Sequence, residues 1–122
     1  MLKIKFKAIL MNKYFAKKTV VDNIEFASKK EARRYSELKL LHLANEISDL
    51  TVQPKFLLQE KFKKNGIHYR AIKYIGDFMY KNKDGKYIVE DVKSKITKTD
   101  VYMIKKKLFE KRYSDLTIVE VF

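Results

Sequence analysis

The sequence predicts a mixed α/β (α+β) domain in the order β-hairpin, helix, three strands, helix, strand. Short apolar runs that alternate with polar residues and end at turn residues predict the strands. Two longer segments with apolar residues at helical spacing predict the helices. The chain has 122 residues and shows no internal repeat or linker-like tract. We therefore expect a single domain spanning residues 1–122.

The N-terminal segment predicts a basic tail followed by a hairpin. Within residues 1–11, "KIKFK" alternates as an edge strand would, but it equally suits an N-terminal basic arm. Residues 19–26, "TVVDNIEF", predict two short strands joined by a turn at Asp22 and Asn23, because these residue types tolerate tight hairpin turns.

The first helix is predicted within residues 28–47. Ser28 is a good N-cap, Glu31 completes a capping box with it, and Asn45 is a suitable C-cap. Helical spacing places Ala32, Tyr35, Leu38 (or the stem of Lys39) and His42 near one face, which we expect to be buried. Three leucines widen this apolar surface: Leu40, Leu41 and Leu43.

The remaining elements follow from breaks in the apolar pattern. Residues 47–62 predict a strand interrupted at Pro54, and residues 63–66, "KKNG", predict a turn. Residues 67–80 then predict one long strand with a bulge near Gly76. We expect a strand at 86–93, a helix at 99–113 and a final strand at 116–122. In the second helix, the residues expected on the buried side include Val101, Ile104 and Leu108, with Tyr102 and Phe109 as further candidates.

The charge of the chain indicates a polyanionic partner. Lys and Arg number 28 against 15 Asp and Glu, a net charge of +13, which on a small domain favours DNA or RNA. A solvated lysine coat is the alternative. The basic residues are mostly lysines, which bind phosphate as point charges and favour recognition of backbone or shape over base sequence. Candidate DNA-binding residues are Arg33, Arg34, Ser94, Lys95, Lys98, Lys105 and Lys106.

Other classes are excluded by composition. The chain has no cysteine, which excludes disulfides and thiolate zinc sites. No apolar run approaches the ~20 residues that span a bilayer, and the lysine-interrupted start does not suit a signal peptide. We expect a cytoplasmic protein with no membrane partner.

Residues 75–94, "IGDFMYKNKDGKYIVEDVKS", contain three charges within apolar strands. The loop Lys83–Asp84–Gly85 suits a three-residue hairpin with a left-handed glycine. That loop places Asp77 opposite Asp91, and Ile75 opposite Lys93. Opposed residues share a face with their Cβ atoms ~5 Å apart. The three charged residues are therefore predicted to converge.

Two carboxylates this close repel each other, more so when they are buried. A divalent cation between them removes the repulsion, and Mg²⁺ suits an all-oxygen site. Lys93 is then placed to act on a water or on developing phosphate charge. This arrangement suggests a hydrolytic metal site. The alternative is a salt-bridge cluster in which Lys93 only neutralises Asp77 and Asp91.

The pattern Asp77…Asp91-Val92-Lys93 resembles the D…(D/E)-x-K signature of the PD-(D/E)XK nuclease superfamily. The resemblance implies a restriction-endonuclease-like core, a mixed central sheet flanked by helices. It implies that Asp77, Asp91 and the carbonyl of Val92 bind Mg²⁺, with Mn²⁺ as an alternative, and that Lys93 is the catalytic lysine. Glu31 would be the helix carboxylate that many members add to the site, although its place in the capping box already accounts for it.

More specifically, five blocks resemble a family of small phage and prophage nuclease-like proteins; they are "NKYFAKKT", "FASKKEARRYSELKLL", "LTVQPKF", "YIGDFMY" and "VEDVKS". The segment "DVKS" is similar to the strand end of archaeal Holliday-junction resolvases. Members of the phage family often have Gly after the lysine, where this chain has Ser94, so activity stays open at this position. The resemblance implies a homodimeric DNA endonuclease acting on branched or duplex DNA in the host bacterial cytoplasm. Another nuclease duty and a non-catalytic nucleic-acid-binding protein are the alternatives.

Overall fold

The computed structural model describes residues 18–94 and 98–122. The expectations for residues 1–11 and for Lys95 lie outside this range. The chain divides into two compact units, residues 1–39 and 40–122, which are taken in turn, and a single domain spanning the chain stays a prediction. Helices and strands are both present, as the α+β class requires. Among the described residues, no helix is long and apolar enough to cross a membrane.

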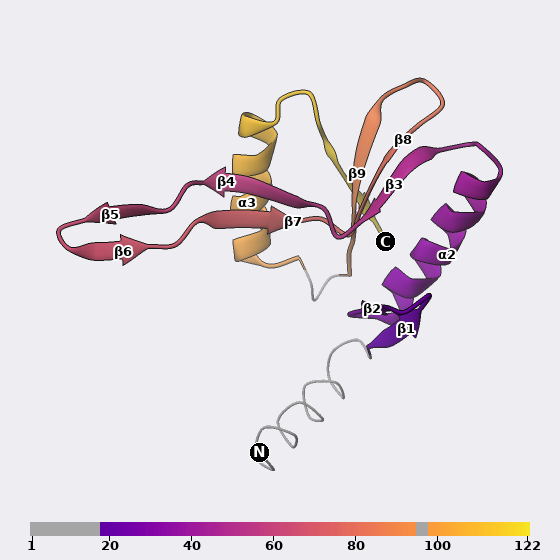
Figure 1. Ribbon diagram of the computed structural model, residues 1–122, viewed down its shortest axis with the longest axis horizontal. Helices are drawn as coiled ribbons and strands as arrows, with labels where there is room; N and C mark the ends of the chain where they lie inside the picture. The colour runs from indigo at the N-terminus through magenta and orange to yellow at the C-terminus, as the bar shows by residue number, and fades with distance from the viewer. Residues whose placement is uncertain (1–17, 95–97) are drawn as a thin grey trace, which may run out of the picture. The chain divides into compact units, whose positions relative to one another are not determined.

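The first unit contains the predicted hairpin and most of the first helix (Figure 1). Strands β1 (Thr19–Val21) and β2 (Ile24–Phe26) pair antiparallel. The two turn residues, Asp22 and Asn23, have φ values of 52° and 62°, the left-handed conformation that a two-residue hairpin turn of this kind needs.

Helix α2 (Lys29–Leu43) begins as predicted. The hydroxyl oxygen of Ser28 accepts a hydrogen bond from the Glu31 backbone N–H at 3.0 Å. The Glu31 carboxylate accepts one from the backbone N–H of Ala27 at 3.3 Å. These bonds satisfy N–H groups that a helix start leaves without partners inside the helix. Beyond the helix end, Asn45 has a φ of 59°, as expected for the residue that terminates it.

The buried side of α2 was predicted correctly except at its end. Ala32, Tyr35 and Leu38 are buried, whereas His42 and the leucines expected to widen this surface, Leu40, Leu41 and Leu43, are exposed. Helical spacing identifies a face, but it does not show how far along the helix other parts of the chain cover that face.

Asp22 ties the hairpin to α2 within the first unit. Its carboxylate accepts hydrogen bonds from the Tyr35 hydroxyl at 2.9 Å and from the Lys39 ammonium at 2.5 Å. These two bonds, with the one from Lys39 contributing more, hold the pKa of Asp22 below its ordinary value of 3.8.

The second unit contains a four-stranded sheet in the order β10-β9-β8-β3. Its strands are β3 (Ser48–Val52), β8 (Phe78–Lys81), β9 (Tyr87–Val92) and β10 (Ile118–Val121). Strand β10 runs parallel to β9, whereas β9 with β8 and β8 with β3 are antiparallel. The sheet is therefore mixed, as expected. A restriction-endonuclease-like core stays a prediction.

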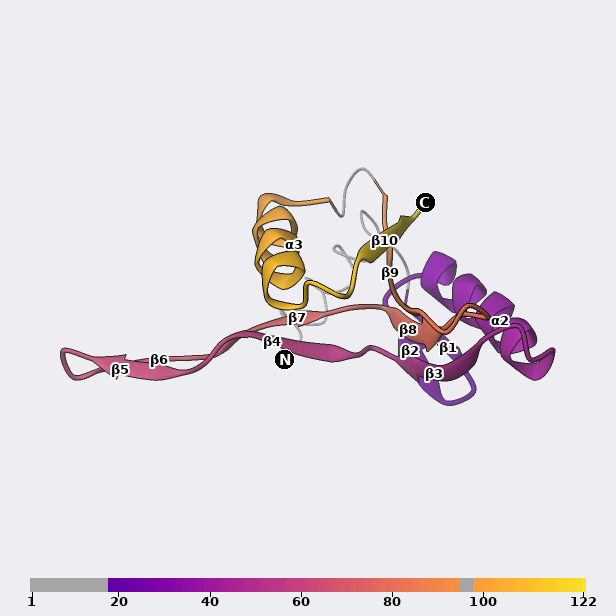
Figure 2. The same cartoon turned by 90° about the horizontal axis from the view of Figure 1, so that it is seen from above.

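A second ladder joins β4 (Lys55–Gln59) to β7 (Ile72–Ile75), and a separate hairpin joins β5 (Phe62–Lys64) to β6 (Ile67–Tyr69). Figures 1 and 2 show the hairpin continuing the ladder, with helix α3 beside β4 and β7. The β5–β6 turn falls at Asn65 and Gly66, within the predicted segment 63–66.

The single long strand predicted for residues 67–80 is wrong, because the chain forms β6, β7 and β8 instead. The second break comes at Gly76, where an added Cβ would meet Val89 Cγ1 at 3.1 Å and Pro54 Cγ at 3.4 Å. Because Gly76 has no side chain, the backbone can pass close to Val89 and Pro54 where it leaves the β4–β7 ladder for the four-stranded sheet. As a result Ile75 pairs with Lys55, and the predicted pairing of Ile75 with Lys93 is wrong.

Helix α3 (Asp100–Arg112) begins at the N-cap Thr99, whose hydroxyl accepts the Tyr102 N–H at 3.2 Å. Its bounds match the prediction, but its predicted buried side is partly wrong. Tyr102 and Phe109 are buried, whereas the helix exposes Val101, Ile104 and Leu108. Apolar residues form two adjacent stripes on α3, one with Ile104 and one with Phe109. Only the stripe with Phe109 packs against the aromatic core.

The core of the second unit is largely aromatic. The ring of Phe109 lies 4.9 Å from that of Phe56, 5.3 Å from that of Tyr74 and 5.2 Å from that of Tyr113, measured between centroids. Val89 and Ile118 from the four-stranded sheet belong to the same cluster. This core therefore places the four-stranded sheet, the β4–β7 ladder and α3 around the candidate site.

Candidate functional site

Asp77 lies where the strands of the second unit meet. Its carbonyl accepts the Gln53 N–H at 2.9 Å, and its own N–H donates to the carbonyl of Glu90 at 3.0 Å. Its side-chain Oδ2 accepts the backbone N–H of Val92 at 2.6 Å. Asp77 is thus bonded to both neighbours of Asp91, which fixes its carboxylate beside β9.

The predicted register of the hairpin is confirmed. Phe78 pairs with Glu90 and Met79 with Val89, and the left-handed glycine is found at Gly85, with a φ of 82°. The regular ladder ends one step before Asp77. There the side chain of Asp77 takes the β9 amide that a continued ladder would have bonded to backbone.

Asp91 is buried, with 5% of its surface exposed. Its Oδ2 accepts the hydroxyl of Tyr74 at 2.5 Å, and its Oδ1 lies 2.8 Å from Lys93 Nζ. Burial, followed by the neighbouring charge of Asp91 and the hydrogen bond to it, raises the pKa of Tyr74 above its ordinary value. Tyr74 therefore remains a protonated donor to the carboxylate.

Lys93 is held from two sides. Its backbone N–H donates to the carbonyl of Val121 at 2.7 Å, which fixes it beside β10. Its ammonium lies between the Asp91 carboxylate and the ring of Tyr102, 3.5 Å from the ring centroid. With 8% of its surface exposed, this cation depends on the carboxylate and the π face for the stabilisation that water would otherwise give.

Glu120 is a site residue that sequence reasoning missed. In the parallel pairing of β9 with β10, Glu120 lies directly opposite Asp91. Its carboxylate accepts the Tyr102 hydroxyl at 2.7 Å and the Lys98 ammonium at 3.2 Å, and Lys106 Nζ lies 3.8 Å from it. The hydrogen bond from Tyr102, more than those basic residues, lowers the pKa of Glu120.

A signal for Glu120 existed in the sequence. It is the lone charge in the apolar strand "LTIVEVF", and a charge within an otherwise apolar strand is also what drew attention to Asp91. The direction and register of that strand against β9 were needed to place it, and neither follows from a local turn.

The structure also places the other predicted site residues. Glu31 lies in the first unit and serves the capping box, and its role as a metal ligand stays a prediction. Arg33 is exposed, and Arg34 pairs with Glu37 at 2.9 Å. Two of the expected DNA-binding residues, Lys98 and Lys106, are the basic partners of Glu120 described above. Ser94 and Lys105 are half-buried.

The donor atoms at this site are of the chemical type that a hard divalent cation binds. Asp77, Asp91 and the Val92 carbonyl offer only oxygen atoms, and Mg²⁺ commonly binds one or two carboxylates and completes its shell with water and phosphate oxygens. Within residues 18–94 and 98–122, no group of three or more carboxylates or imidazoles gathers to hold a metal ion. A cation here would therefore depend on the two aspartates.

Comparison with known proteins gave one match. Neither the curated proteins nor the solved structures contain a match to this chain. One family model, described as "Protein of unknown function (DUF1064)", matches residues 11–121. That match spans nearly the whole sequence, so the chain belongs to the DUF1064 family.

Proposed function

We propose that this protein is a metal-dependent DNA endonuclease of the PD-(D/E)XK type that hydrolyses phosphodiesters. The observation that supports this most directly is that the buried ion pair of Asp91 and Lys93 lies beside Asp77, whose carboxylate is bonded to the backbone of Val92 between them. Two carboxylates and an ammonium in one place are the groups that phosphodiester hydrolysis with a divalent cation requires. The net charge of +13 supports DNA as the partner.

Each residue has a defined role in this proposal. Asp77 and Asp91, with the Val92 carbonyl, would hold Mg²⁺ or Mn²⁺, which would supply Lewis-acid chemistry at the scissile phosphate. Asp77 is kept in position by its three hydrogen bonds with Gln53, Glu90 and Val92, and Tyr74 orients Asp91. Lys93 orients the attacking water and stabilises the charge that develops on phosphate oxygens.

Branched DNA such as a Holliday junction is the proposed substrate, in phage recombination or replication. The chain is lysine-rich, and lysines bind phosphate as point charges, which suits recognition of DNA shape rather than sequence. Paired cuts in a junction need two active sites, so the active form is proposed to be a homodimer with a two-fold axis. The proposed location is the cytoplasm of the host cell.

A second candidate function is favoured by one observation. Both carboxylate oxygens of Asp91 already have protein partners, Tyr74 and Lys93. The buried Asp91–Lys93 pair, with Tyr74, can therefore serve a purely structural role in a non-catalytic nucleic-acid-binding protein. That function predicts DNA binding with steep salt dependence and no cleavage.

The deciding experiment is cleavage of a labelled four-way junction, with linear duplex as control, in Mg²⁺, Mn²⁺ or EDTA. Wild type is compared with Asp77→Asn and Asp91→Asn, and with Asp115→Asn as a matched control at an exposed position. Circular dichroism confirms that each variant is folded.

Symmetric cuts that need metal, Asp77 and Asp91, but not Asp115, would support the resolvase-type nuclease. Cleavage of junction and duplex alike would retain the nuclease and reject the preference for branched DNA. Tight junction binding without cleavage in either metal would reject catalysis and favour the binding protein.

A further inference from the structure

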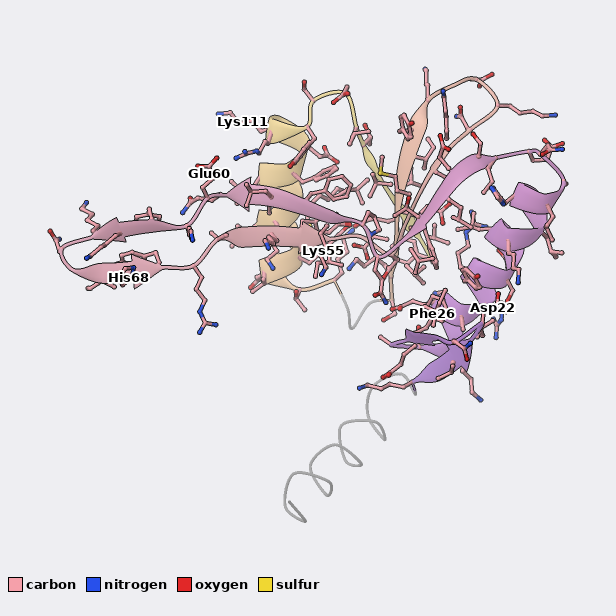
Figure 3. The ribbon with its side chains drawn as sticks, in the orientation of Figure 1. Asp22, Phe26, Lys55, Glu60, His68 and Lys111 are labelled. Atoms are coloured by element: carbon pink, nitrogen blue, oxygen red, sulfur yellow. The ribbon has the colours of Figure 1, made fainter. Side chains whose placement is uncertain are left out.

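The β5–β6 hairpin is not used by the core. Every residue of both strands is exposed, although the hairpin carries apolar side chains. Figures 1 and 2 show it as the far end of the ribbon that begins with β4 and β7, and Figure 3 shows His68 on it. A two-stranded hairpin contributes little stability alone, so its exposed side chains call for a role outside the fold.

The two faces of this hairpin differ in chemistry. Its register pairs Phe62 with Tyr69, and Lys64 with Ile67. Because strand side chains alternate between faces, these four residues lie on one face. The rings of Phe62 and Tyr69 stack there, with centroids 4.7 Å apart and planes inclined by 12°. This side is called the aromatic face below.

The opposite side is cationic. Lys63 pairs with His68 there, and the next residues of the same parity are Lys61 and Arg70. Residues 61–70, "KFKKNGIHYR", contain four Lys and Arg and no acidic residue; three of the four belong to this side, and Lys64 belongs to the aromatic face. In the part of the chain that the structure describes, no ion pair involves any of these four basic side chains. Their charge is therefore available to a partner.

We infer that the β5–β6 hairpin binds DNA at unpaired bases. Its lysines and Arg70 attract the phosphates, and the stacked Phe62–Tyr69 pair offers a flat π surface on which an unpaired base stacks. Aromatic residues beside a cationic track are how proteins hold single strands without reading sequence. Phe62 and Tyr69 are each 43% exposed, so their rings remain accessible although they touch each other.

This inference rests on the proposed function only for the class of ligand, DNA. It adds where the strand is held and which part of a branched substrate is recognised, namely the unpaired bases at the branch. A duplex offers few unstacked bases, so the aromatic face should contribute little to duplex binding. Another copy of this chain is the other candidate occupant of the aromatic face, and the test separates the two.

The experiment measures fluorescence anisotropy of a labelled oligo(dT) and of a blunt duplex in EDTA, so that binding is read without cleavage. The aromatic variant carries Phe62→Leu and Tyr69→Leu, which keep apolar strand residues but remove the rings. Tyr87→Leu is the matched control, because Tyr87 is a strand tyrosine with a similar exposed fraction, 42%. The charge variant carries Lys63→Gln and Arg70→Gln, with Lys86→Gln as its control.

The aromatic variant is expected to bind oligo(dT) about tenfold more weakly than wild type, the size of a lost base–aromatic stack. Its duplex binding should change by less than about twofold. The charge variant should lower the slope of log K against log[salt] by about 0.7 for each lost phosphate contact on a single strand. Tyr87→Leu and Lys86→Gln should bind as wild type does.

Unchanged oligo(dT) affinity in the aromatic variant would overturn the inference. If that variant instead converts a dimer to a monomer in sedimentation, with oligo(dT) binding unchanged, the aromatic face is an interface between copies and the inference is likewise overturned.

The junction-cleavage assay keeps this result apart from the proposed function. If the protein cleaves the junction but the hairpin variants bind oligo(dT) as tightly as wild type, the inference about the hairpin is rejected and the nuclease proposal is kept. If no junction is cleaved but the hairpin variants bind oligo(dT) more weakly, the inference about the hairpin is kept and the nuclease proposal is rejected.

Discussion

Lys93→Met should destabilise the protein through Asp91 rather than through lost packing. Methionine keeps most of the length and apolar character of the lysine stem but removes the ammonium. In the structure that ammonium lies 2.8 Å from Asp91 Oδ1, and the two side chains are only 9% and 7% exposed. The substitution leaves the Asp91 carboxylate buried and still bonded to the Tyr74 hydroxyl, but without the ammonium that neutralised it.

The expected loss follows from this burial. Removing one partner of a buried ion pair costs about 3–5 kcal/mol, because the other charge stays uncompensated. The retained hydrogen bond from Tyr74 favours the lower end, so we expect about 3 kcal/mol. For a chain of this length that corresponds to a fall in Tm of roughly 10 °C.

The assay is urea unfolding of four proteins: wild type, Lys93→Met, Asp91→Asn and the double variant. Removing both charges of a buried pair is often nearly neutral, so the double variant should lie within about 1 kcal/mol of wild type. The double-mutant cycle then gives a coupling energy of about 2 kcal/mol or more. Urea m-values should not change, since the folded core is the same.

A loss below about 1 kcal/mol for Lys93→Met, or a double variant less stable than both single variants, would refute the reasoning. The first result would mean that water already screens the pair. A second measurement follows from the proposed metal site: Mg²⁺ should raise the Tm of Lys93→Met more than that of the double variant. Equal shifts would argue against Asp91 as a ligand.

The remaining predictions concern three other contacts. Tyr74→Phe removes the hydroxyl bonded to Asp91 but keeps the buried ring, and urea unfolding should show a loss of about 2 kcal/mol. Phe109→Ala opens a cavity in the aromatic core and should cost about 4 kcal/mol in the same assay, whereas a cost below 1 kcal/mol would mean that the core closes around it. The pKa of Asp22, measured by NMR titration, should lie below 3.8, mainly because of the Lys39 ammonium. Stability from this contact is therefore present above pH 3.8 and is lost as pH falls through the lowered pKa. Lys39→Met should move the pKa of Asp22 back toward 3.8. An unchanged pKa in that variant would contradict the assignment to Lys39.

Features set by neighbouring residues could be predicted from the sequence. The turns at Asp22–Asn23, at Asn65–Gly66 and at Gly85 need left-handed residues, and these residue types supply them. The turn at Gly85 then sets the register of β8 against β9, since loop length and turn type fix which residues oppose each other. That register is what brings Asp77 beside Asp91, so the centre of the candidate site could be derived before the fold was known.

Features that depend on distant parts of the chain could not be predicted. Apolar residues mark two stripes on α3, and only packing against Phe56 and Tyr74 decides that Phe109 is buried while Ile104 is exposed. Similarly, the strand pattern of residues 67–80 marks Gly76 only as a bulge. It does not show that the chain changes ladders there, because that crossing is set by the neighbours of Gly76 in space.

The sequence by itself therefore determined the α+β class, most turns and helix bounds, and the meeting of Asp77 with Asp91. Only the tertiary structure decided what surrounds these residues: Tyr74 comes from the second ladder to bond Asp91, Tyr102 from α3 to cover the Lys93 ammonium, and Glu120 from a parallel strand to lie opposite Asp91. The physical reason is the range of the forces involved. Turn chemistry acts over a few residues, whereas parallel pairing and core packing join segments whose register no local residue encodes.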